Sequence, residues 1–169
     1  MPFDNIKRQL GLIPQEDPIN NPPSTVDEAL GVDALGEFKR KISGVESSFG
    51  EDLEHPVVEK GIQAGDKAIG EYAMMPNTIQ EFARRMGNRK LASLPKELYP
   101  DYLEKNPKVQ DEITNAALEH VFNRFNKDPE KAAYGWNQGH NLNPDSITKE
   151  KLDNSNYIEK FRNIKSKVK

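Results

Sequence analysis

The feature that most constrains the fold is an apolar stripe in residues 35–50, which read LGEFKRKISGVESSFG. Its apolar side chains recur at steps of three and four residues, and this spacing places them on one face of an α-helix. Such a face has to be buried, so the chain must build a core against this segment. The stripe comprises Leu35, Phe38, Ile42, Val45 and Phe49, and Gly50 is expected to end the helix.

Glu46 lies at the edge of this stripe, near the C-terminal end of the expected helix. Partial burial disfavours a charged carboxylate, and so does the negative end of the helix dipole. Both effects raise the pKa of a carboxyl group, and a carboxyl that stays protonated near neutral pH can act as a general acid. The alternative is a solvated glutamate on the helix flank, which is the commoner role of a single Glu.

Length and composition limit the class of protein. A chain of 169 residues is long enough for one domain with a core of several helices. It contains no run of about 18 apolar residues, so no membrane span is expected. Residues 1–18 lack the apolar region and the cleavage site of a secretory signal. Cysteine is absent, which excludes disulfides, thiolate nucleophiles and Cys-based zinc sites.

The net charge of −3 argues against a general nucleic-acid-binding protein, because such proteins usually carry a basic surface. The charge is unevenly distributed, since residues 149–169 carry +4 and residues 1–148 carry −7. A basic tail can contact an anionic polymer, a membrane surface or a partner protein, but it is more often a solvated helix face.

Prolines divide the chain into an N-terminal arm and a folded domain. Residues 1–24 contain five prolines and two adjacent asparagines, which predict an extended arm, and residues 25–169 are expected to form the domain. Thr25 with Glu28 forms a capping-box pattern that predicts a short first helix. Residues 51–75 contain several glycines and no sustained period, which indicates a long loop or a β-hairpin-like excursion of the kind that often carries function.

Helix start signals recur through the rest of the chain. Thr78 with Glu81 forms a second capping box, and Gly87 is the expected stop of that helix. Pro100 is expected to break or kink a short helix in residues 96–104. No strand-length alternating run occurs, so the predicted fold class is mainly α, with at most a minor β-hairpin. The other expected segments are a connector at residues 88–95 and helices opened by Asn106 with Pro107, by Asp128 with Pro129, by Asn143 with Pro144 and by Ser155.

Four short motifs stand out along the chain. They are ESS at residues 46–48, AIGEYAMMPNTI at 68–79, AAYGWNQG at 132–139 and NYIEKF at 156–161. In this order, and at about this spacing, they resemble the motifs of the lytic transglycosylase family, also called the SLT or goose-type-lysozyme-like family. The resemblance covers about residues 35–161. It implies a lysozyme-like single domain that cleaves the glycan strands of bacterial peptidoglycan.

The resemblance also implies roles for individual residues. Glu46 corresponds to the family's single catalytic acid, and Ser47 follows it in the same motif. Tyr157 corresponds to the late tyrosine that faces the acid across the groove. Gly70 corresponds to the glycine of the family's loop, and Met75 to the Met-Pro-x-Thr element that lines the cleft. Further substrate contacts are expected from Tyr72, Trp136, Asn137 and Gln138, whose aromatic faces and amides suit sugar rings and acetamido groups, and His55 is a candidate supporting contact.

In the family, the glutamate protonates the leaving oxygen of a β-1,4 bond while the N-acetyl group of the substrate gives nucleophilic help. The deprotonated glutamate then draws a proton from the C6 hydroxyl of N-acetylmuramic acid, and a 1,6-anhydro ring forms. This scheme uses one carboxylate where glycosidases normally use two. It needs no cofactor, and three histidines without HExxH spacing make a metal site unlikely by pattern.

The chain departs from the family pattern at two positions. Ala73 stands where a substrate-contacting Gln is usual, and Trp136 stands where Tyr is usual, so these two departures concern the subsite contacts rather than the acid. Several residues also have a purely structural alternative: Met75 and Trp136 as core side chains, and Tyr157 as packing for the last helix. Glu71 is the candidate second carboxylate if the reaction is hydrolytic.

The expected partner is therefore the peptidoglycan glycan strand. The missing signal and the proline-rich arm favour a virion-associated protein of a bacteriophage that acts in the bacterial periplasm or cell wall, with other virion proteins as further partners. A bacterial cytoplasmic or secretion-system origin stays open. Two alternative functions also stay open: a muramidase that hydrolyses the same bond, and a non-catalytic wall-binding or virion structural module.

Overall fold

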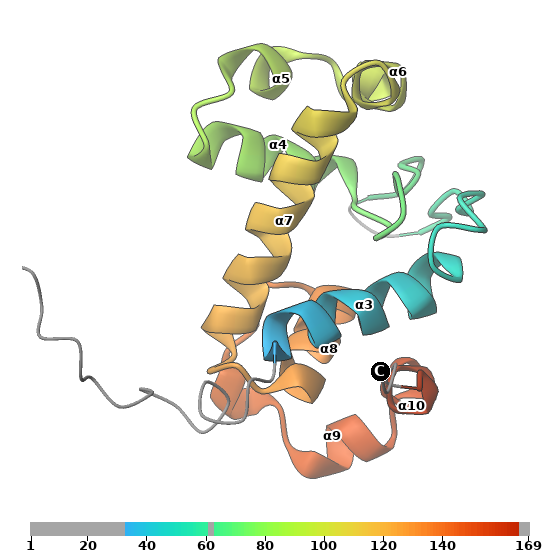
Figure 1. The fold of residues 1–169 in the computed structure, drawn as a ribbon, viewed down its shortest axis with the longest axis vertical. Helices are drawn as coiled ribbons and strands as arrows, with labels where there is room; N and C mark the ends of the chain where they lie inside the picture. The colour runs from blue at the N-terminus through green and yellow to red at the C-terminus, as the bar shows by residue number, and fades with distance from the viewer. Residues whose placement is uncertain (1–32, 61–62, 166–169) are drawn as a thin grey trace, which may run out of the picture. The chain divides into compact units, whose positions relative to one another are not determined.

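A computed structural model describes residues 33–60 and 63–165 of the chain. The chain divides into two units, Met1–Asp33 and Ala34–Lys169, and all the helices described here belong to the second. The expected arm at residues 1–24 and the short helix expected from Thr25 lie outside the described residues. The described part contains eight α-helices and no strand, which confirms the prediction of a mainly α fold (Figure 1). No helix in it is long and apolar enough to cross a membrane.

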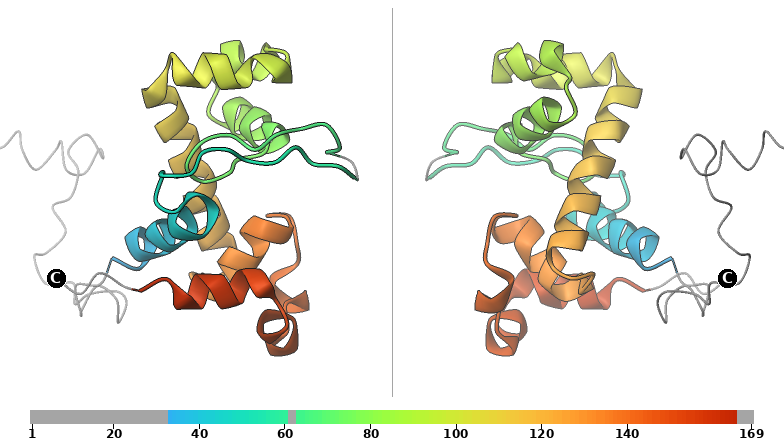
Figure 2. Two further views of the ribbon diagram at one scale, coloured as in Figure 1. Left: turned by 90° about the vertical axis from the view of Figure 1, so that its right-hand side faces the viewer. Right: turned by 90° about the vertical axis from the view of Figure 1, so that its left-hand side faces the viewer.

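The longest helix, α7, connects two groups of helices, one at each end of it (Figures 1 and 2). Helices α4, α5 and α6 belong to the group near its N-terminal half, and α3, α8 and α10 to the group near its C-terminal half. The helices are α3 (Ala34–Ser47), α4 (Pro76–Arg85), α5 (Arg89–Ser93), α6 (Tyr99–Glu104), α7 (Pro107–Arg124), α8 (Pro129–Gln138), α9 (Lys149–Asp153) and α10 (Asn156–Asn163), with 3-10 turns at Lys96–Leu98 and Pro144–Ser146.

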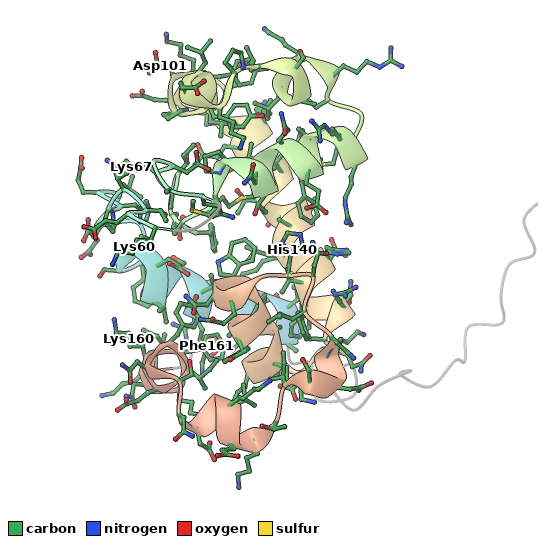
Figure 3. All side chains as sticks on the ribbon, turned by 180° about the vertical axis from the view of Figure 1, so that it is seen from behind. Lys60, Lys67, Asp101, His140, Lys160 and Phe161 are labelled. Atoms are coloured by element: carbon green, nitrogen blue, oxygen red, sulfur yellow. The ribbon has the colours of Figure 1, made fainter. Side chains whose placement is uncertain are left out.

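Each group has its own cluster of buried apolar side chains, which we call the lower and the upper core after their places in Figure 1. In the lower core the Phe38 ring stacks on Phe122 with centroids 5.1 Å apart, and Phe161 points in from α10 (Figure 3). Burying a large apolar side chain contributes about 1.5–3 kcal/mol. The lower core comprises Phe38, Ile42, Leu118, Val121, Phe122, Phe125, Ala132, Ala133, Ile147, Leu152, Ile158 and Phe161, and the upper core Met74, Ile79, Phe82, Ala83, Leu91, Tyr99, Leu103, Ile113 and Ala117.

Side-chain caps form at three of the predicted helix starts, Asp128, Asn143 and Ser155, whereas the side chain of Asn106 makes no capping bond. The Asp128 Oδ1 accepts hydrogen bonds at 3.0 Å from the amides of the second and third residues of α8. The Ser155 Oγ accepts one at 3.4 Å from the amide of Ile158 in α10. These bonds satisfy amides that have no partner inside the first turn of a helix. They also fix where α8 and α10 begin, and both helices carry residues of the site described below.

The end of α3 differs from the prediction. The helix ends at Ser47 rather than at Gly50, because Ser48, Phe49 and Gly50 all have positive φ angles, of 52°, 65° and 83°. The Phe49 amide donates to the Ser43 carbonyl at 3.2 Å and closes the helix end. Phe49 was expected on the buried stripe but is 51% exposed, because the left-handed turn takes it off the helical face.

The break expected in residues 96–104 is present, because a 3-10 turn at Lys96–Leu98 is followed by the separate helix α6. Pro100 lies in the first turn of α6, where its missing amide hydrogen costs no helical bond. Two further expectations about helices are wrong. Residues 88–95, expected as a connector, contain α5, which the side chain of Asn88 caps. Helix α4 begins at Pro76 with no side-chain cap, so the capping box expected at Thr78 does not form.

Gly135 lies inside α8, although glycine disfavours the interior of a helix. A Cβ atom at this position would lie 2.2 Å from the ring of Phe125, at the end of α7. Glycine therefore allows α8 to approach α7 this closely, although glycine lowers the intrinsic stability of the helix.

Residues 51–75 form the long loop that the glycine content predicted, described here apart from residues 61–62. Two isolated antiparallel bridges join Val57 to Lys67 and Ile69 to Met74. The excursion is therefore hairpin-like without any regular strand in its described part, and it runs from the end of α3 to the start of α4 (Figure 2).

Candidate functional site

A side-chain hydrogen bond joins the candidate acid to the candidate tyrosine. Glu46 lies in the last turn of α3, and Tyr157 lies in the first turn of α10, 111 residues further along the chain. The Tyr157 Oη donates to the Glu46 Oε1 at 2.6 Å, a short distance typical of a bond between a hydroxyl and a charged carboxylate. The packing of α10 against α3 brings the two together.

Burial raises the pKa of Glu46 above its ordinary value, as expected from its place beside the apolar stripe. The hydrogen bond from Tyr157 and the positive charges of His55 and Lys160 oppose this effect in part. Burial also raises the pKa of Tyr157 well above its ordinary value, and the charge of Glu46 adds to the shift. Tyr157 therefore stays protonated and acts as a hydrogen-bond donor over the whole range in which Glu46 titrates.

Glu46 lines a pocket of about 370 Å³, which we call the acid pocket. Its lining comes from the end of α3, the long loop, the start of α4 and the end of α8. Among the described residues that line it, Glu46 is the single acidic side chain. The lining residues are Glu46, His55, Pro56, Val58, Ala68, Ala73, Met74, Met75, Thr78, Trp136, Asn137 and His140.

Several predicted substrate contacts are in this pocket. Met75 lines it from the residue before α4, and Asn137 lines it from the last turn of α8. Trp136 lines it as well, although it also packs against both cores, and its Nε1 donates to the Tyr72 carbonyl at 3.3 Å. Trp136 is thus a core side chain that also forms part of the pocket wall, and its contact with a sugar stays a prediction.

The predicted supporting residues make contacts mainly with backbone atoms. The His55 Nε2 lies 2.8 Å from the Gly70 carbonyl oxygen and so joins two arms of the long loop. Gly70 has a φ of +74°, a conformation that favours glycine, and a Cβ there would lie 2.2 Å from the Gln110 Nε2 at the end of a flexible side chain. Ser47 is buried beneath the helix end, where its Oγ accepts from the Gly50 amide at 2.9 Å.

Two candidate residues lie away from the acid pocket. Tyr72 lines a separate hollow beside Gln110, so it does not offer its ring to a ligand next to Glu46. Glu71 lines the same hollow and its carboxylate accepts a hydrogen bond from the Ser43 Oγ. The expectation that Glu71 is a second carboxylate beside Glu46 therefore has no support from the pocket lining.

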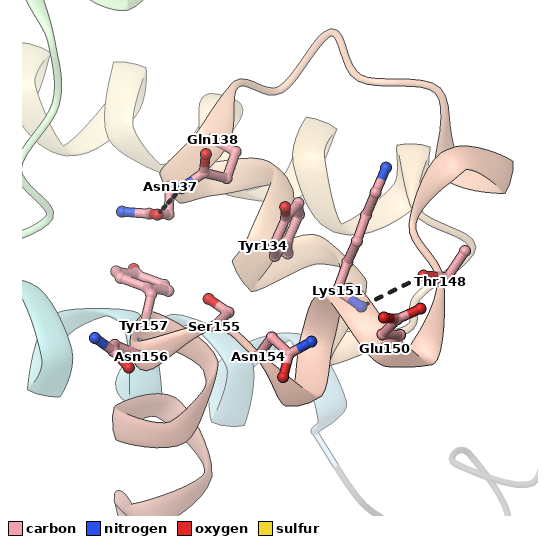
Figure 4. Close-up of a pocket in the computed structure, with 10 residues that line it drawn as sticks. All are labelled: Tyr134, Asn137, Gln138, Thr148, Glu150, Lys151, Asn154, Ser155, Asn156 and Tyr157. Atoms are coloured by element: carbon pink, nitrogen blue, oxygen red, sulfur yellow. Dashed lines mark hydrogen bonds between the residues drawn. The ribbon is translucent and has the colours of Figure 1, made fainter.

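Gln138 belongs to a second, larger pocket of about 810 Å³, which we call the polar pocket (Figure 4). Asn137 lines both pockets, and Tyr157 lines the polar pocket while it is bonded to Glu46 in the acid pocket. The two pockets therefore share Asn137, and the hydrogen bond of Tyr157 connects the wall of the polar pocket to Glu46. The polar pocket is lined by Tyr134, Asn137, Gln138, Thr148, Glu150, Lys151, Asn154, Ser155, Asn156 and Tyr157.

His140 was not among the predicted site residues, yet it lines the acid pocket from the loop after α8. Its Nε2 lies 3.0 Å from the Glu81 Oε2, and Glu81 also accepts a bond from Arg85 at 2.6 Å. Glu81 and His140 are 59 residues apart, and no local pattern in the sequence links them. In the part of the chain that the structure describes, no group of three or more His, Cys, Asp or Glu side chains is placed to hold a metal ion.

Comparisons with protein-family models, with curated proteins and with solved structures found no match to this chain.

Proposed function

We propose that this protein, on a lysozyme-like fold, cleaves the β-1,4 bond between N-acetylmuramic acid and N-acetylglucosamine in peptidoglycan as a lytic transglycosylase. The observation that carries the proposal is Glu46, a carboxyl of raised pKa that lines a pocket and is oriented by Tyr157 at 2.6 Å. This combination suits a group that gives up a proton and then takes one back.

In the proposed reaction, protonated Glu46 gives its proton to the glycosidic oxygen as the bond from that oxygen to C1 of the muramic acid breaks. The N-acetylglucosamine part leaves with the new hydroxyl, and the acetamido oxygen of the muramic acid stabilises C1 from the opposite face. The Glu46 carboxylate then takes the proton of the C6 hydroxyl as that oxygen bonds to C1. The products are a 1,6-anhydro end and a regenerated, protonated Glu46.

Tyr157 has a distinct part in this cycle. Because its hydroxyl donates to the Glu46 Oε1, the other carboxyl oxygen is left to exchange the proton with the substrate. The bond also stabilises the carboxylate that exists between the two proton transfers, since a donor to the charged form favours that form. Burial and the Tyr157 bond thus act in opposite directions on the pKa of Glu46.

The lining of the acid pocket favours transglycosylation over hydrolysis. A hydrolase of the usual kind needs a second carboxylate close to the first, as nucleophile or as base for a water molecule. Glu46 is the single carboxylate among the described lining residues, and Glu71 is bonded to Ser43 instead. A one-carboxylate reaction, in which a hydroxyl of the substrate replaces water, fits this arrangement better.

The test compares the wild-type protein with Glu46→Gln in clearing a suspension of purified cell walls, with mass spectrometry of the released sugars. The amide keeps the shape of the side chain but cannot exchange the proton, so activity should fall about 10²- to 10⁴-fold. Glu71→Gln is the matched control, because it removes a nearby carboxylate outside the pocket, and it should keep activity within a few-fold. Circular dichroism checks that both variants fold.

Three results would contradict the proposal. Undiminished clearing by Glu46→Gln would remove the acid from the mechanism. Reducing muramic acid ends without the anhydro mass would make the protein a muramidase. A wild-type protein that binds cell walls without releasing sugars would be a binding module.

A further inference from the structure

A strongly basic segment lies at the turn between α4 and α5, and the proposed function makes no use of it. Residues 82–96 contain five basic side chains and no acidic one, so they carry +5. Since the whole chain carries −3, the other residues together carry −8. Four of the five charges fall within residues 84–90, which we call the basic tip. They belong to Arg84, Arg85, Arg89 and Lys90.

The basic tip presents its charges to solvent, since all four of its basic side chains are exposed. Within the part of the chain that the structure describes, Arg85 is the only one of the four in an ion pair, with Glu81. The Lys90 Nζ lies 5.2 Å from the centroid of the Tyr102 ring, a contact that leaves its charge uncompensated. Three of the four charges are therefore available to an anionic partner.

The stability of the fold does not explain two of these charges. Arg89 and Lys90 lie at the beginning of α5, and no acidic residue accompanies them in its first turn. The positive end of the helix dipole repels cations at this end of a helix. Arg84 and Arg85, in the last turn of α4, are placed favourably by the same rule. A basic pair that opposes the dipole suits contact with an anion outside the molecule.

The basic tip projects from the surface and carries an apolar side chain. Met86 is 44% exposed between the two pairs of basic residues. Gly87 follows with a φ of +72°, and a Cβ there would meet nothing within 4 Å, so the turn faces open space. None of the three pockets described above includes a residue of the tip. Dissolved polymers such as single-stranded nucleic acids are held in grooves, whereas a projecting turn fits a flat surface.

The acidic part of the molecule faces another direction. Figure 1 shows the turn from α4 to α5 on the left and the long loop after α3 on the right. A negatively charged surface would attract the first and repel the second, so it would orient the protein with the basic tip toward it. The exposed acidic residues at the start of that loop are Glu51, Asp52, Glu54 and Glu59.

We propose that the basic tip docks on a bilayer of anionic phospholipids. Arg84, Arg89 and Lys90 pair with the lipid phosphates, and Met86 enters the headgroup region between them. Exposed Met86 favours a bilayer over a dissolved polyanion, because a polyanion would pair with the charges and leave this side chain in water. The inference is independent of the proposed function, since no residue of the tip lines the acid pocket.

The first experiment measures the binding of the full chain to vesicles by flotation. The wild type should bind vesicles that contain phosphatidylglycerol, should not bind vesicles of phosphatidylcholine alone, and should be released as salt is raised. The variant Arg84→Gln/Arg89→Gln/Lys90→Gln removes the three charges without an ion pair. Each basic residue near an anionic bilayer strengthens binding about fivefold, so this variant should bind about 100-fold more weakly.

The matched control removes the same number of charges elsewhere. The variant Lys149→Gln/Lys160→Gln/Lys165→Gln, on exposed positions near the end of the described chain, has the same net charge as the tip variant. It should bind within a few-fold of the wild type. Circular dichroism checks that both variants fold.

The second experiment reports which face meets the bilayer. Because the chain contains no cysteine, Met86→Cys offers a single site for a polarity-sensitive fluorophore. Its emission should shift to the blue with phosphatidylglycerol vesicles. The same label at Val57→Cys, which is 54% exposed on the long loop, should not respond.

Three results would overturn the inference. Equal losses in the two triple variants would show that net charge, rather than the basic tip, attracts the protein to the vesicles. A response of the label at Val57 without one at Met86 would show that another face meets the bilayer. Binding of duplex DNA or of a soluble polyphosphate that the tip variant loses, with no binding of vesicles, would assign the basic tip to a dissolved polyanion.

Discussion

The two sides of the acid pocket are built in different ways. On one side, Glu46 lines the pocket from α3, and a side-chain hydrogen bond of 2.6 Å joins it to Tyr157 behind it on α10; both helices pack on the lower core. On the other side, His55, Ala73 and Met75 come from the long loop and its junction with α4. There the contacts are mostly with the backbone.

The backbone of the loop side shows this clearly. His55 is bonded to the Gly70 carbonyl, and a bridge joins Ile69 to Met74. Gly70 and Ala73 both have positive φ angles, of 74° and 49°. Such conformations turn the chain sharply, and they place Ala73 in the pocket while Tyr72 faces the separate hollow.

In this fold, the residues proposed to transfer protons and the residues that shape the pocket thus come from different parts of the chain. The groups proposed to transfer protons lie on helices, and the apolar faces of these helices are held in place by burial in a common core. The wall that would shape the ligand stands on a loop, where side chains can change without moving the acid. Changes on the helix side should therefore alter the stability and the rate, whereas changes on the loop side should have smaller effects.

The largest effect is expected where the helix side is most tightly packed. Gly135→Ala places a Cβ about 2.2 Å from the Phe125 ring, which is buried in the lower core. Overpacking of this kind costs about 1–3 kcal/mol, and we expect the upper end because the ring has little room to move. Urea unfolding followed by circular dichroism measures the loss.

Gly44→Ala is the matched control for Gly135→Ala. It also lies inside a helix, but its Cβ would meet the exposed ring of Phe49 at 2.9 Å and the end of the Ile164 side chain at 3.0 Å, both of which can shift. Since alanine favours the helix by about 0.5–1 kcal/mol over glycine, the net change should be close to zero. Equal losses in the two variants would mean that the approach of α8 to α7 is not the tight contact described above.

A smaller effect is expected from Tyr157→Phe, which removes only the hydroxyl that orients the acid. We expect kcat to fall about tenfold, a change of about 1.4 kcal/mol. Because the Tyr157 bond lowers the pKa of Glu46, its loss should raise that pKa further, and the activity should then be lost at a higher pH on the alkaline side. A profile of cell-wall clearing against pH measures both. An unchanged alkaline limb would show that Glu46 is not the group whose protonation limits the reaction.

Much of the helix side was predictable because its signals are local. The three- and four-residue spacing of Phe38 and Ile42 predicted the buried face of α3, and Asp128 and Ser155 predicted where α8 and α10 begin. These patterns depend on residues within one or two turns of each other. The raised pKa of Glu46 followed from the same spacing, since a residue at the edge of a buried face is partly buried itself.

The loop side was less predictable, because non-local contacts determine its shape. Nothing in the run from Gly70 to Ala73 indicates that Tyr72 turns away from the pocket, since that depends on the positive φ at both ends. The left-handed conformation of Phe49, a residue that usually favours extended or helical backbone, was likewise missed. The contact of His140 with Glu81 joins segments 59 residues apart, so only the folded chain reveals it.

The smallest effect is expected from this last pair, which holds His140 at the rim of the acid pocket. Burial alone would raise the pKa of Glu81, but the hydrogen bond and charge of His140, together with Arg85, outweigh it and lower that pKa below its ordinary 4.5. A lowered folded-state pKa contributes stability above the unfolded-state value, and the contribution is lost as the pH falls through the folded-state value. Glu81→Gln should therefore cost about 0.2–1 kcal/mol at pH 7, as expected of a partly exposed ion pair, and almost nothing near pH 3.

Thermal unfolding of wild type and Glu81→Gln at both pH values measures this difference, with Glu97→Gln on an exposed position as the control. The activity of Glu81→Gln should stay within a few-fold of the wild type, because Glu46 carries the proton in the proposed reaction and His140 only lines the pocket. A loss of activity as large as that expected for Tyr157→Phe would contradict the comparison, because it would mean that Glu81 and His140 take part in the reaction itself. A loss of stability that persists near pH 3 would instead mean that Glu81 supports the fold through packing rather than through its charge.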